Sequence, residues 1–282
     1  MNAFTPRLDI LAEAQRGLWP ELAQVPAEFT LYGGTAIALQ LGHRQSVDFD
    51  FFSSQPFDPH ELQESIPFLA DATVELSKAN TLTVFVDRGK RVAVSFFGLP
   101  WLRSLRLPWV CADNGLKVAS LLDLAATKAS AVQGPAEAKD YLDIYALMTL
   151  GGIAPTEMLK AAGALYGRPF SPLATLKALS HFDDGDLRTL PAHVKSALAT
   201  AAHKAGLRPP SIPPGVREEP ATYAVRMAKG IIDPQSWAYW NSVMGRFPPP
   251  PLPVRRFPDG TVGPETAGRT ADSVARFLRP PE

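Results

Sequence analysis

Short apolar runs alternate with amphipathic segments along residues 1–112, a pattern that predicts strands and helices mixed within one domain. Helical spacing of apolar residues, with Asp58 and Pro59 as an N-cap signal for the last helix, predicts helices at residues 8–22, 35–41 and 58–66. Alternating or short apolar runs predict strands at residues 29–32, 47–52, 72–77, 82–87, 91–97 and 107–111. Arg88-Gly89-Lys90 predicts a hairpin turn between the strands at residues 82–87 and 91–97.

Residues 113–206 have mostly helical periodicity and form a second part of the chain. Gly134-Pro135 and Gly151-Gly152 interrupt this periodicity, as expected at helix ends. The predicted helices cover residues 116–132, 136–150, 155–166, 172–182 and 190–205. We expect this helical region to complete a cleft with the first domain.

Residues 207–282 differ from the rest because proline is abundant and no period is sustained. Short helices are predicted at residues 220–232 and 233–244, followed by a polyproline run at 247–253. We expect a partly ordered extension. The chain as a whole is predicted to be α+β, a small mixed sheet with helices followed by a helical region and a Pro-rich tail.

Composition narrows the function classes only modestly. Lys+Arg and Asp+Glu both count 28 among 282 residues, so no global basic field indicates nucleic acid, although a local basic groove is compatible with zero net charge. Cys111 is the single cysteine, which rules out an intramolecular disulfide, and we expect it to be buried. The sequence contains neither a signal-peptide pattern nor about 18 unbroken apolar residues, so we expect a cytoplasmic protein without a membrane partner.

A pair of adjacent glycines forms the first candidate ligand-binding turn. Gly33, Gly34 and Thr35 stand between a predicted strand and a predicted helix. Adjacent glycines let the backbone approach a ligand closely, and a helix that begins there adds positive partial charge. This combination suits the phosphates of a nucleoside triphosphate.

A pair of carboxylates follows closely along the chain. Asp48 and Asp50 lie two residues apart in a predicted strand, so their side chains share one face. Their neighbours Val47, Phe49 and Phe51 are then predicted to point into a core. Hard oxygens in such a pair suit Mg²⁺ (or Mn²⁺), which is commonly held by one or two carboxylates together with substrate phosphates.

Each feature alone has an ordinary structural explanation. A D-x-D strand is commonly a solvated face, and a glycine pair is commonly a turn. Their order and closeness favour one site, because a ligand with phosphates and a metal would bring them to the same point. His43 and Arg44 border this site, where they either contact a phosphate or a base, or belong to the surface.

The segment from Leu31 to Phe52 resembles the signature of the AbiEii/AbiGii-type toxin nucleotidyltransferases, within the DNA polymerase β-like superfamily. The resemblance is close over this segment, includes Arg44 and Ser46, and continues more loosely to about Met148. It implies a polymerase β-like fold and an NTP substrate at Gly33, Gly34, Thr35, Arg44 and Ser46.

The resemblance extends to two later motifs. Lys128 in Leu124–Ala129 matches the family's helical lysine, which would contact the phosphates, and Asp140 and Asp143 match its later acidic motif. Asp140 would then help to bind the nucleotide and Asp143 would be catalytic with Lys128, Asp48 and Asp50. Their ordinary alternatives are a solvated lysine and a helix-end aspartate. Lys117 is a weaker candidate for the lysine that contacts the phosphates.

One departure from the superfamily pattern limits the expected chemistry. Many of its enzymes supply a third carboxylate from a later strand, but residues 91–96 contain none, and Asp87 sits at a strand end. The absence puts a full two-metal mechanism in doubt. Other candidates are weaker, including the scattered His60, His181, His193 and His203 and the aromatic residues Trp237 and Trp240.

These observations predict an Mg²⁺-dependent nucleotidyltransferase. It would move a nucleoside monophosphate from an NTP to an RNA hydroxyl, such as a tRNA 3′ end, or to a protein hydroxyl. The resemblance implies a toxin paired with an antitoxin. The alternative is a module of the same fold that binds nucleotide or protein without turnover.

Overall fold

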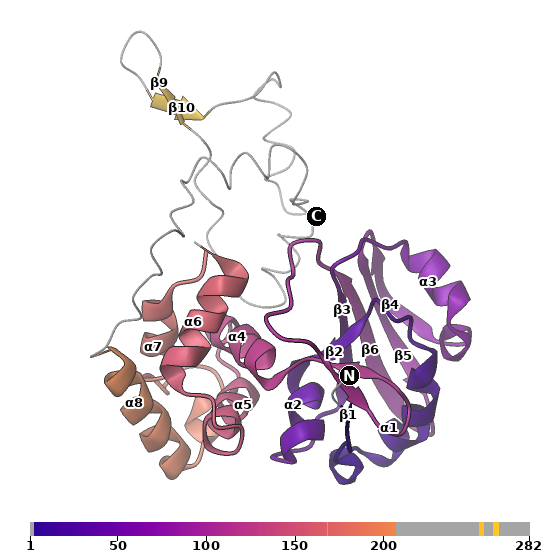
Figure 1. Cartoon of the computed structure of the whole chain (residues 1–282), viewed down its shortest axis with the longest axis horizontal. Helices are drawn as coiled ribbons and strands as arrows, with labels where there is room; N and C mark the ends of the chain where they lie inside the picture. Colours follow the sequence, from indigo (N-terminus) through magenta and orange to yellow (C-terminus); the bar gives the residue numbers. More distant parts are fainter. Residues whose placement is uncertain (1–2, 168, 207–253, 257–261, 265–282) are drawn as a thin grey trace. The chain divides into compact units, whose positions relative to one another are not determined.

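The computed structural model describes residues 3–167 and 169–206 and two short strands near the C-terminus (Figure 1). These two strands, β9 (Val254–Arg256) and β10 (Val262–Pro264), pair antiparallel and belong to a second compact unit. All other described elements belong to the first unit. The predicted helices at 220–232 and 233–244, with Trp237 and Trp240, and the polyproline run at 247–253 lie outside the described residues.

The first unit is built on an eight-stranded mixed sheet with the order β1-β7-β8-β2-β3-β6-β5-β4. β3 pairs antiparallel with β2 and parallel with β6, so it lies near the middle of the sheet. The strands are β1 (Ala3–Phe4), β2 (Thr30–Tyr32), β3 (Asp48–Ser53), β4 (Thr73–Lys78), β5 (Thr81–Asp87), β6 (Arg91–Gly98), β7 (Trp109–Cys111) and β8 (Lys117–Val118).

Helices surround this sheet and continue as a helical group. The first ones are the 3₁₀ helix η1 (Leu8–Ile10), α1 (Glu13–Leu18), η2 (Trp19–Gln24), α2 (Gly33–Leu41), α3 (Pro59–Ser65) and η3 (Pro67–Leu69). The later ones are α4 (Leu121–Ala131), α5 (Ala138–Thr149), α6 (Pro155–Tyr166), α7 (Pro172–Ala178), η4 (Leu187–Thr189) and α8 (Ala192–Gly206). α2 packs against both α4 and α5, which connects the sheet to the helical group.

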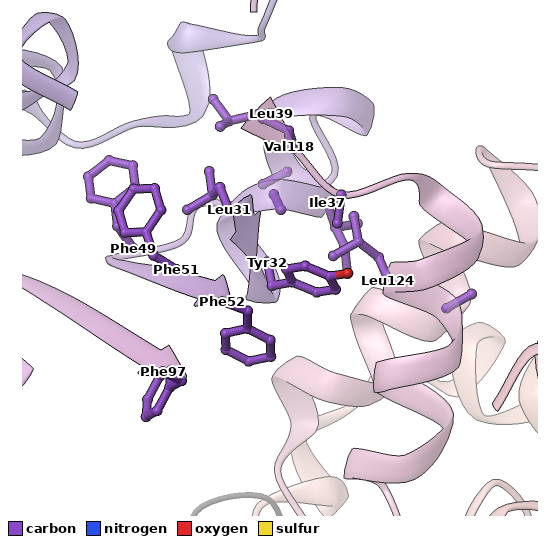
Figure 2. Close-up of a cluster of buried hydrophobic side chains, with 14 of the residues drawn as sticks. Leu31, Tyr32, Ile37, Leu39, Phe49, Phe51, Phe52, Phe97, Val118 and Leu124 are labelled. Atoms are coloured by element: carbon purple, nitrogen blue, oxygen red, sulfur yellow. The ribbon is translucent and has the colours of Figure 1, made fainter. Parts of the chain in front are cut away.

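α1 contacts β6, η3 contacts β5 and α3 contacts β4, and side chains of all three helices belong to the core of the sheet. Phe49 and Phe51 of β3 are fully buried there, together with Val84 and Val94 of the neighbouring strands. Figure 2 shows Phe52 leaving β3 on the other side from Phe49 and Phe51, as the alternation of a strand requires. The ring of Phe52 stacks on Tyr32, with 4.8 Å between ring centroids.

The α+β prediction is confirmed, but two predicted helices were wrong in part. The helix predicted at residues 8–22 is divided into η1, α1 and η2. Pro20 has no amide hydrogen to continue an α-helix, so the chain changes to 3₁₀ geometry there. The helix predicted at 116–132 begins only at Leu121, where the Ser120 hydroxyl caps it by accepting the amide of Asp123 at 3.1 Å.

The segment before Ser120 is strand β8 because it pairs with two neighbours. Val118 lies beside Leu31 of β2 and opposite Trp109 of β7. Those pairings outweigh the helical pattern, as tertiary contacts commonly do. Cys111 is buried at the end of β7, as expected. In the described part of the chain, no helix has the length and apolar character needed to cross a membrane.

Candidate active site

A tight turn from β2 into α2 forms one side of the candidate site. α2 begins at Gly33, and no side chain caps its first turn, so the amide groups there are not satisfied by a capping residue. The hydroxyl of Thr35 donates a hydrogen bond to the backbone carbonyl of Asp48, which ties this turn to β3. A helix N-terminus of this kind suits an anionic ligand.

The two glycines are needed for side-chain packing as well as for backbone shape. Gly33 has φ +72°, in the left-handed region that favours glycine. A Cβ at Gly33 would collide with the carboxylate of Asp50, and a Cβ at Gly34 would collide with the guanidinium of Arg44. Both glycines were predicted to lie against a ligand, and in the structure they also make room for two neighbouring charged residues.

This geometry predicts the effect of replacing Gly34 with alanine. The added methyl group must displace the Arg44 guanidinium, because the two would otherwise overlap. We expect affinity for an NTP, measured by isothermal titration calorimetry, to fall about tenfold or more, since a displaced group in a preorganised site commonly costs more than 1.4 kcal/mol. Gly163→Ala is the matched control, because Gly163 lies in α6 without a positive φ and its Cβ would meet no atom within 4 Å. Unchanged affinity in Gly34→Ala would contradict this packing argument.

Asp48 and Asp50 occupy the predicted positions on one face of β3. Both side chains are partly buried, while Phe49 and Phe51 point into the core on the other face. The prediction for Val47 was wrong, because this residue precedes the strand and is 69% exposed. In the register of the sheet, Asp50 lies beside Tyr32 of β2, so the carboxylates stand next to the turn that begins α2.

Asp50 is affected both by its burial and by the charge of Asp48. The hydroxyl of Ser46 donates to Oδ1 of Asp48 at 3.2 Å. Burial and the charge of Asp48 raise the pKa of Asp50 from 3.8 to about 7, against the opposing effect of Lys128 and Lys139. A carboxylate that retains a proton near neutral pH has too little positive charge around it. A divalent cation would supply that charge.

The pKa of Asp50 leads to a prediction about stability. Because the pKa is higher in the folded protein than in the unfolded chain, the folded protein binds more protons between about pH 4 and pH 7, and its stability falls as pH rises through that window. Asp50→Asn should therefore raise the free energy of unfolding, on the order of 2 kcal/mol, at about pH 8 without divalent cations. Near pH 4, at the lower end of that window, the change should be much smaller, because the unfolded chain also begins to retain the proton there.

Urea denaturation at both pH values measures this effect. Asp71→Asn, at an exposed aspartate, serves as the control and should behave like the wild type at either pH. An equal effect of Asp50→Asn at both pH values would contradict the raised pKa.

A second group of charges centres on Asp143 of α5, whose side chain is fully buried. Its Oδ1 accepts hydrogen bonds from Arg44 Nε at 2.6 Å and contacts His43 Nε2 at 2.7 Å. Its Oδ2 accepts from Arg44 Nη2 at 2.9 Å and lies 2.8 Å from Lys128 Nζ. Burial alone would raise the pKa of Asp143, but Lys128, His43 and Arg44 outweigh it and hold the pKa below its usual range.

Lys128 of α4 joins this group to the carboxylates of β3. Its ammonium lies 2.6 Å from Asp140 Oδ1 as well as 2.8 Å from Asp143. Burial opposes its charge, but Asp143 and Asp140 raise the pKa of Lys128 above its usual value, so it remains protonated. An ammonium has three donors, and two of them are directed to these carboxylates. The charge of Lys128 also acts on Asp50.

The structure therefore brings together most of the residues singled out from the sequence. Gly33, Gly34, Thr35, Arg44, Ser46, Asp48, Asp50, Lys128, Asp140 and Asp143 are linked by the contacts above. Lys117 does not join them, because its ammonium donates to the backbone carbonyl of Ala27 at 2.7 Å. His43 borders the site through Asp143 rather than lying on the surface, and its side chain is 6% exposed.

One basic residue was missed as a site residue from the sequence. Lys139 is exposed and pairs with Glu137 at 2.7 Å. Its charge interacts with Asp48 and Asp50 across the site. The sequence carried a signal, because Lys139 immediately precedes Asp140 at the start of a helix, but helical position alone does not show which strand it faces.

β6 contains no carboxylate that could join Asp48 and Asp50, and Ser95 lies beside Asp50 instead. This residue pairs with Asp50 in the β3–β6 register, on the same face, and accepts a hydrogen bond from the Thr83 hydroxyl at 3.3 Å. Among the described residues, no group of three or more His, Cys, Asp or Glu side chains is placed to hold a metal ion. The carboxylates of Asp48 and Asp50 fit one cation that takes its remaining oxygen ligands from a bound phosphate.

This chain is similar to a known protein family and to individual known proteins. The sequence profile described as "Nucleotidyl transferase AbiEii toxin, Type IV TA system" matches residues 21–218. An uncharacterized protein of Aquifex aeolicus (strain VF5) is 31% identical over 159 residues, which are 56% of this chain and 75% of that protein. A crystal structure of an H. pylori protein assigned as a nucleotidyltransferase has a TM-score of 0.45 and 14% identity, over 68% of this chain and 91% of that one.

The profile match defines the class of protein as a nucleotidyl transferase. This chain belongs to the AbiEii toxin family, and the matched residues 21–218 cover the glycine turn, the acidic strand, Lys128 and α5.

Proposed function

We propose that this protein transfers a nucleoside monophosphate from an NTP to a hydroxyl group of an acceptor. The observation that carries the proposal is the convergence at one point of an uncapped helix N-terminus, two carboxylates on one strand face and a buried lysine. Positive groups for phosphates and a negatively charged pair for a cation are both needed for this chemistry, and both are provided here.

Each residue has a proposed task. The backbone amides at Gly33, Gly34 and Thr35 face the phosphates, and Lys128 neutralises their charge. The hydroxyl of Thr35 holds this turn against β3 through its bond to the Asp48 carbonyl. Asp48 and Asp50 would hold Mg²⁺ (or Mn²⁺), which when bound screens the phosphate charge and aligns the reacting oxygens. Ser46 orients Asp48 through its hydrogen bond.

Asp140 and Asp143 have a supporting task under this proposal. They keep Lys128 charged and hold it in place, although both were also candidates for direct contact with substrate. Asp143 further fixes Arg44 beside Gly34, so the guanidinium lies at the start of α2. Catalysis would then arise from positioning and charge neutralisation rather than from a covalent intermediate.

The acceptor is proposed to be RNA, such as a tRNA 3′ end, or a protein hydroxyl. As a member of a toxin family, the protein is proposed to arrest growth in the absence of a cognate antitoxin. Incubating the purified protein with each radiolabelled NTP, Mg²⁺ and either total RNA or cell protein tests the proposal. Label in one acceptor fraction, from one preferred NTP, is expected; no label in any fraction would contradict the proposal.

A non-catalytic binding module is the second candidate. Ser95 favours it, because the strand beside Asp50 provides a hydroxyl where a third carboxylate would help to activate the acceptor. Calorimetry separates the two candidates when it accompanies the transfer assay. Tight NTP binding without transfer to either fraction would favour the binding module.

A further inference from the structure

The face of the sheet that carries Asp48 and Asp50 continues beyond the site across β6 and β5. In the register, one cross-strand row contains Asp48, Ala93 and Phe85. Because neighbouring strands lie about 4.8 Å apart, Phe85 is about 10 Å from Asp48 along this row. Ala93 stands between them in the row, and its small side chain leaves space between the Asp48 carboxylate and the Phe85 ring.

The next row runs parallel to the first and is polar. It contains Asp50, Ser95 and Thr83, and the last two share a hydrogen bond of 3.3 Å. Ser95 is buried, and every other residue of these two rows is partly exposed. The opposite face of the same strands is fully buried, as shown by Val84 and Val94. The two rows therefore continue the candidate active site directly.

Phe85 on this face has a cation above its ring. The guanidinium carbon of Arg91 lies 5.7 Å from the ring centroid, and the Arg91 side chain is exposed. Arg91 is opposite Asp87 in the register, whose Oδ1 accepts the amide of Gly89 in the hairpin turn. A flat ring with an adjacent guanidinium is suited to stack on a nucleobase and to pair with a phosphate.

We infer that this face, formed by Ser95, Ala93, Thr83, Phe85 and Arg91, binds a single-stranded nucleic-acid acceptor whose terminal hydroxyl reaches Asp48 and Asp50. The inference rests on the proposed function and selects nucleic acid over protein as the acceptor. Arg91 moves from the ring of Phe85 to pair with the backbone of the bound strand, and the ring that it uncovers stacks on a base close to the reacting end. The hydroxyls of Ser95 and Thr83 face the sugar-phosphate between them.

Fluorescence anisotropy with a short 5′-fluorescein-labelled oligoadenylate tests this inference without requiring turnover. Phe85→Ala should raise the Kd for the oligonucleotide about tenfold or more, because stacking on one base is worth about that factor. Phe85→Tyr should restore binding, because its ring also stacks. Arg91→Ala should raise the Kd and reduce its dependence on salt. Arg188→Ala, at an exposed arginine of η4, is the matched control and should bind like the wild type.

Calorimetry with NTP and Mg²⁺ distinguishes failure of the inference from failure of the proposed function. The same variants should bind NTP like the wild type, and their melting temperatures show whether they are folded. If Phe85→Ala is poorly folded, Arg91→Ala decides, since its side chain is exposed. Three results would overturn the inference. Arg91→Ala could bind the oligonucleotide like the wild type, the variants could lose NTP binding in parallel with oligonucleotide binding, or label could be transferred to a protein hydroxyl alone. Absent NTP binding by the wild type would refute the proposed function instead.

Discussion

Asp48→Asn is expected to lower the rate of nucleotide transfer about 10³-fold or more, which corresponds to roughly 4 kcal/mol of transition-state stabilisation. Asparagine has nearly the same shape and can still accept the hydrogen bond from Ser46. It lacks the negative charge that a divalent cation requires from this face of β3. The loss should therefore affect catalysis more than folding, and Asp50→Asn should have a similar effect.

Transfer of radiolabel under single-turnover conditions measures this loss. Asp71→Asn, at an exposed aspartate outside the site, is the matched control and should retain wild-type rates. Melting temperatures of the variants show that they are folded. If Asp48→Asn and Asp50→Asn both transferred label at the wild-type rate, the assignment of these carboxylates would be refuted.

Asp143→Ala is expected to lower the free energy of unfolding by about 3 to 5 kcal/mol at neutral pH. The substitution leaves His43, Lys128 and the partly buried Arg44 around a site without its central carboxylate. Because the pKa of Asp143 is lowered in the folded protein, its contribution is present above its ordinary pKa and is lost as pH falls through that value and below.

Urea denaturation at about pH 7 measures the stability change. Glu64→Ala provides the control, because its pairing with His60 at 3.4 Å is exposed and such pairs contribute little. Asp143→Asn keeps the volume and removes only the charge, so it should also destabilise the protein if charge is the cause. Wild-type stability in both Asp143 variants would contradict the central position of this carboxylate.

Local patterns were sufficient to predict much of the acidic strand and the glycine turn. The period of two in β3 places Asp48 and Asp50 on one face and Phe49 and Phe51 on the other, because alternation is a property of any strand. The limits of elements were less predictable. β8 is a strand because Val118 finds partners in β2 and β7, and those partners are distant in sequence.

The contacts of Asp143 could not be predicted from sequence for the same reason. Asp143 and Arg44 are separated by 99 positions, and only the packing of α2 against α5 brings them together. The close approach of Asp50 to Gly33 also depends on the pairing of β2 with β3. Spacing in the sequence indicated which residues carry the chemistry, while tertiary packing determines which of them neutralise one another.

The position of the label in the NTP tests the central claim most directly. Two parallel reactions with the acceptor differ only in whether the preferred NTP is labelled at the α- or the γ-phosphate. Transfer of a nucleoside monophosphate predicts label in the acceptor from the α-labelled NTP only, with the γ-label released as pyrophosphate. Label in the acceptor from the γ-labelled NTP would show phosphoryl transfer instead and would contradict the proposed function.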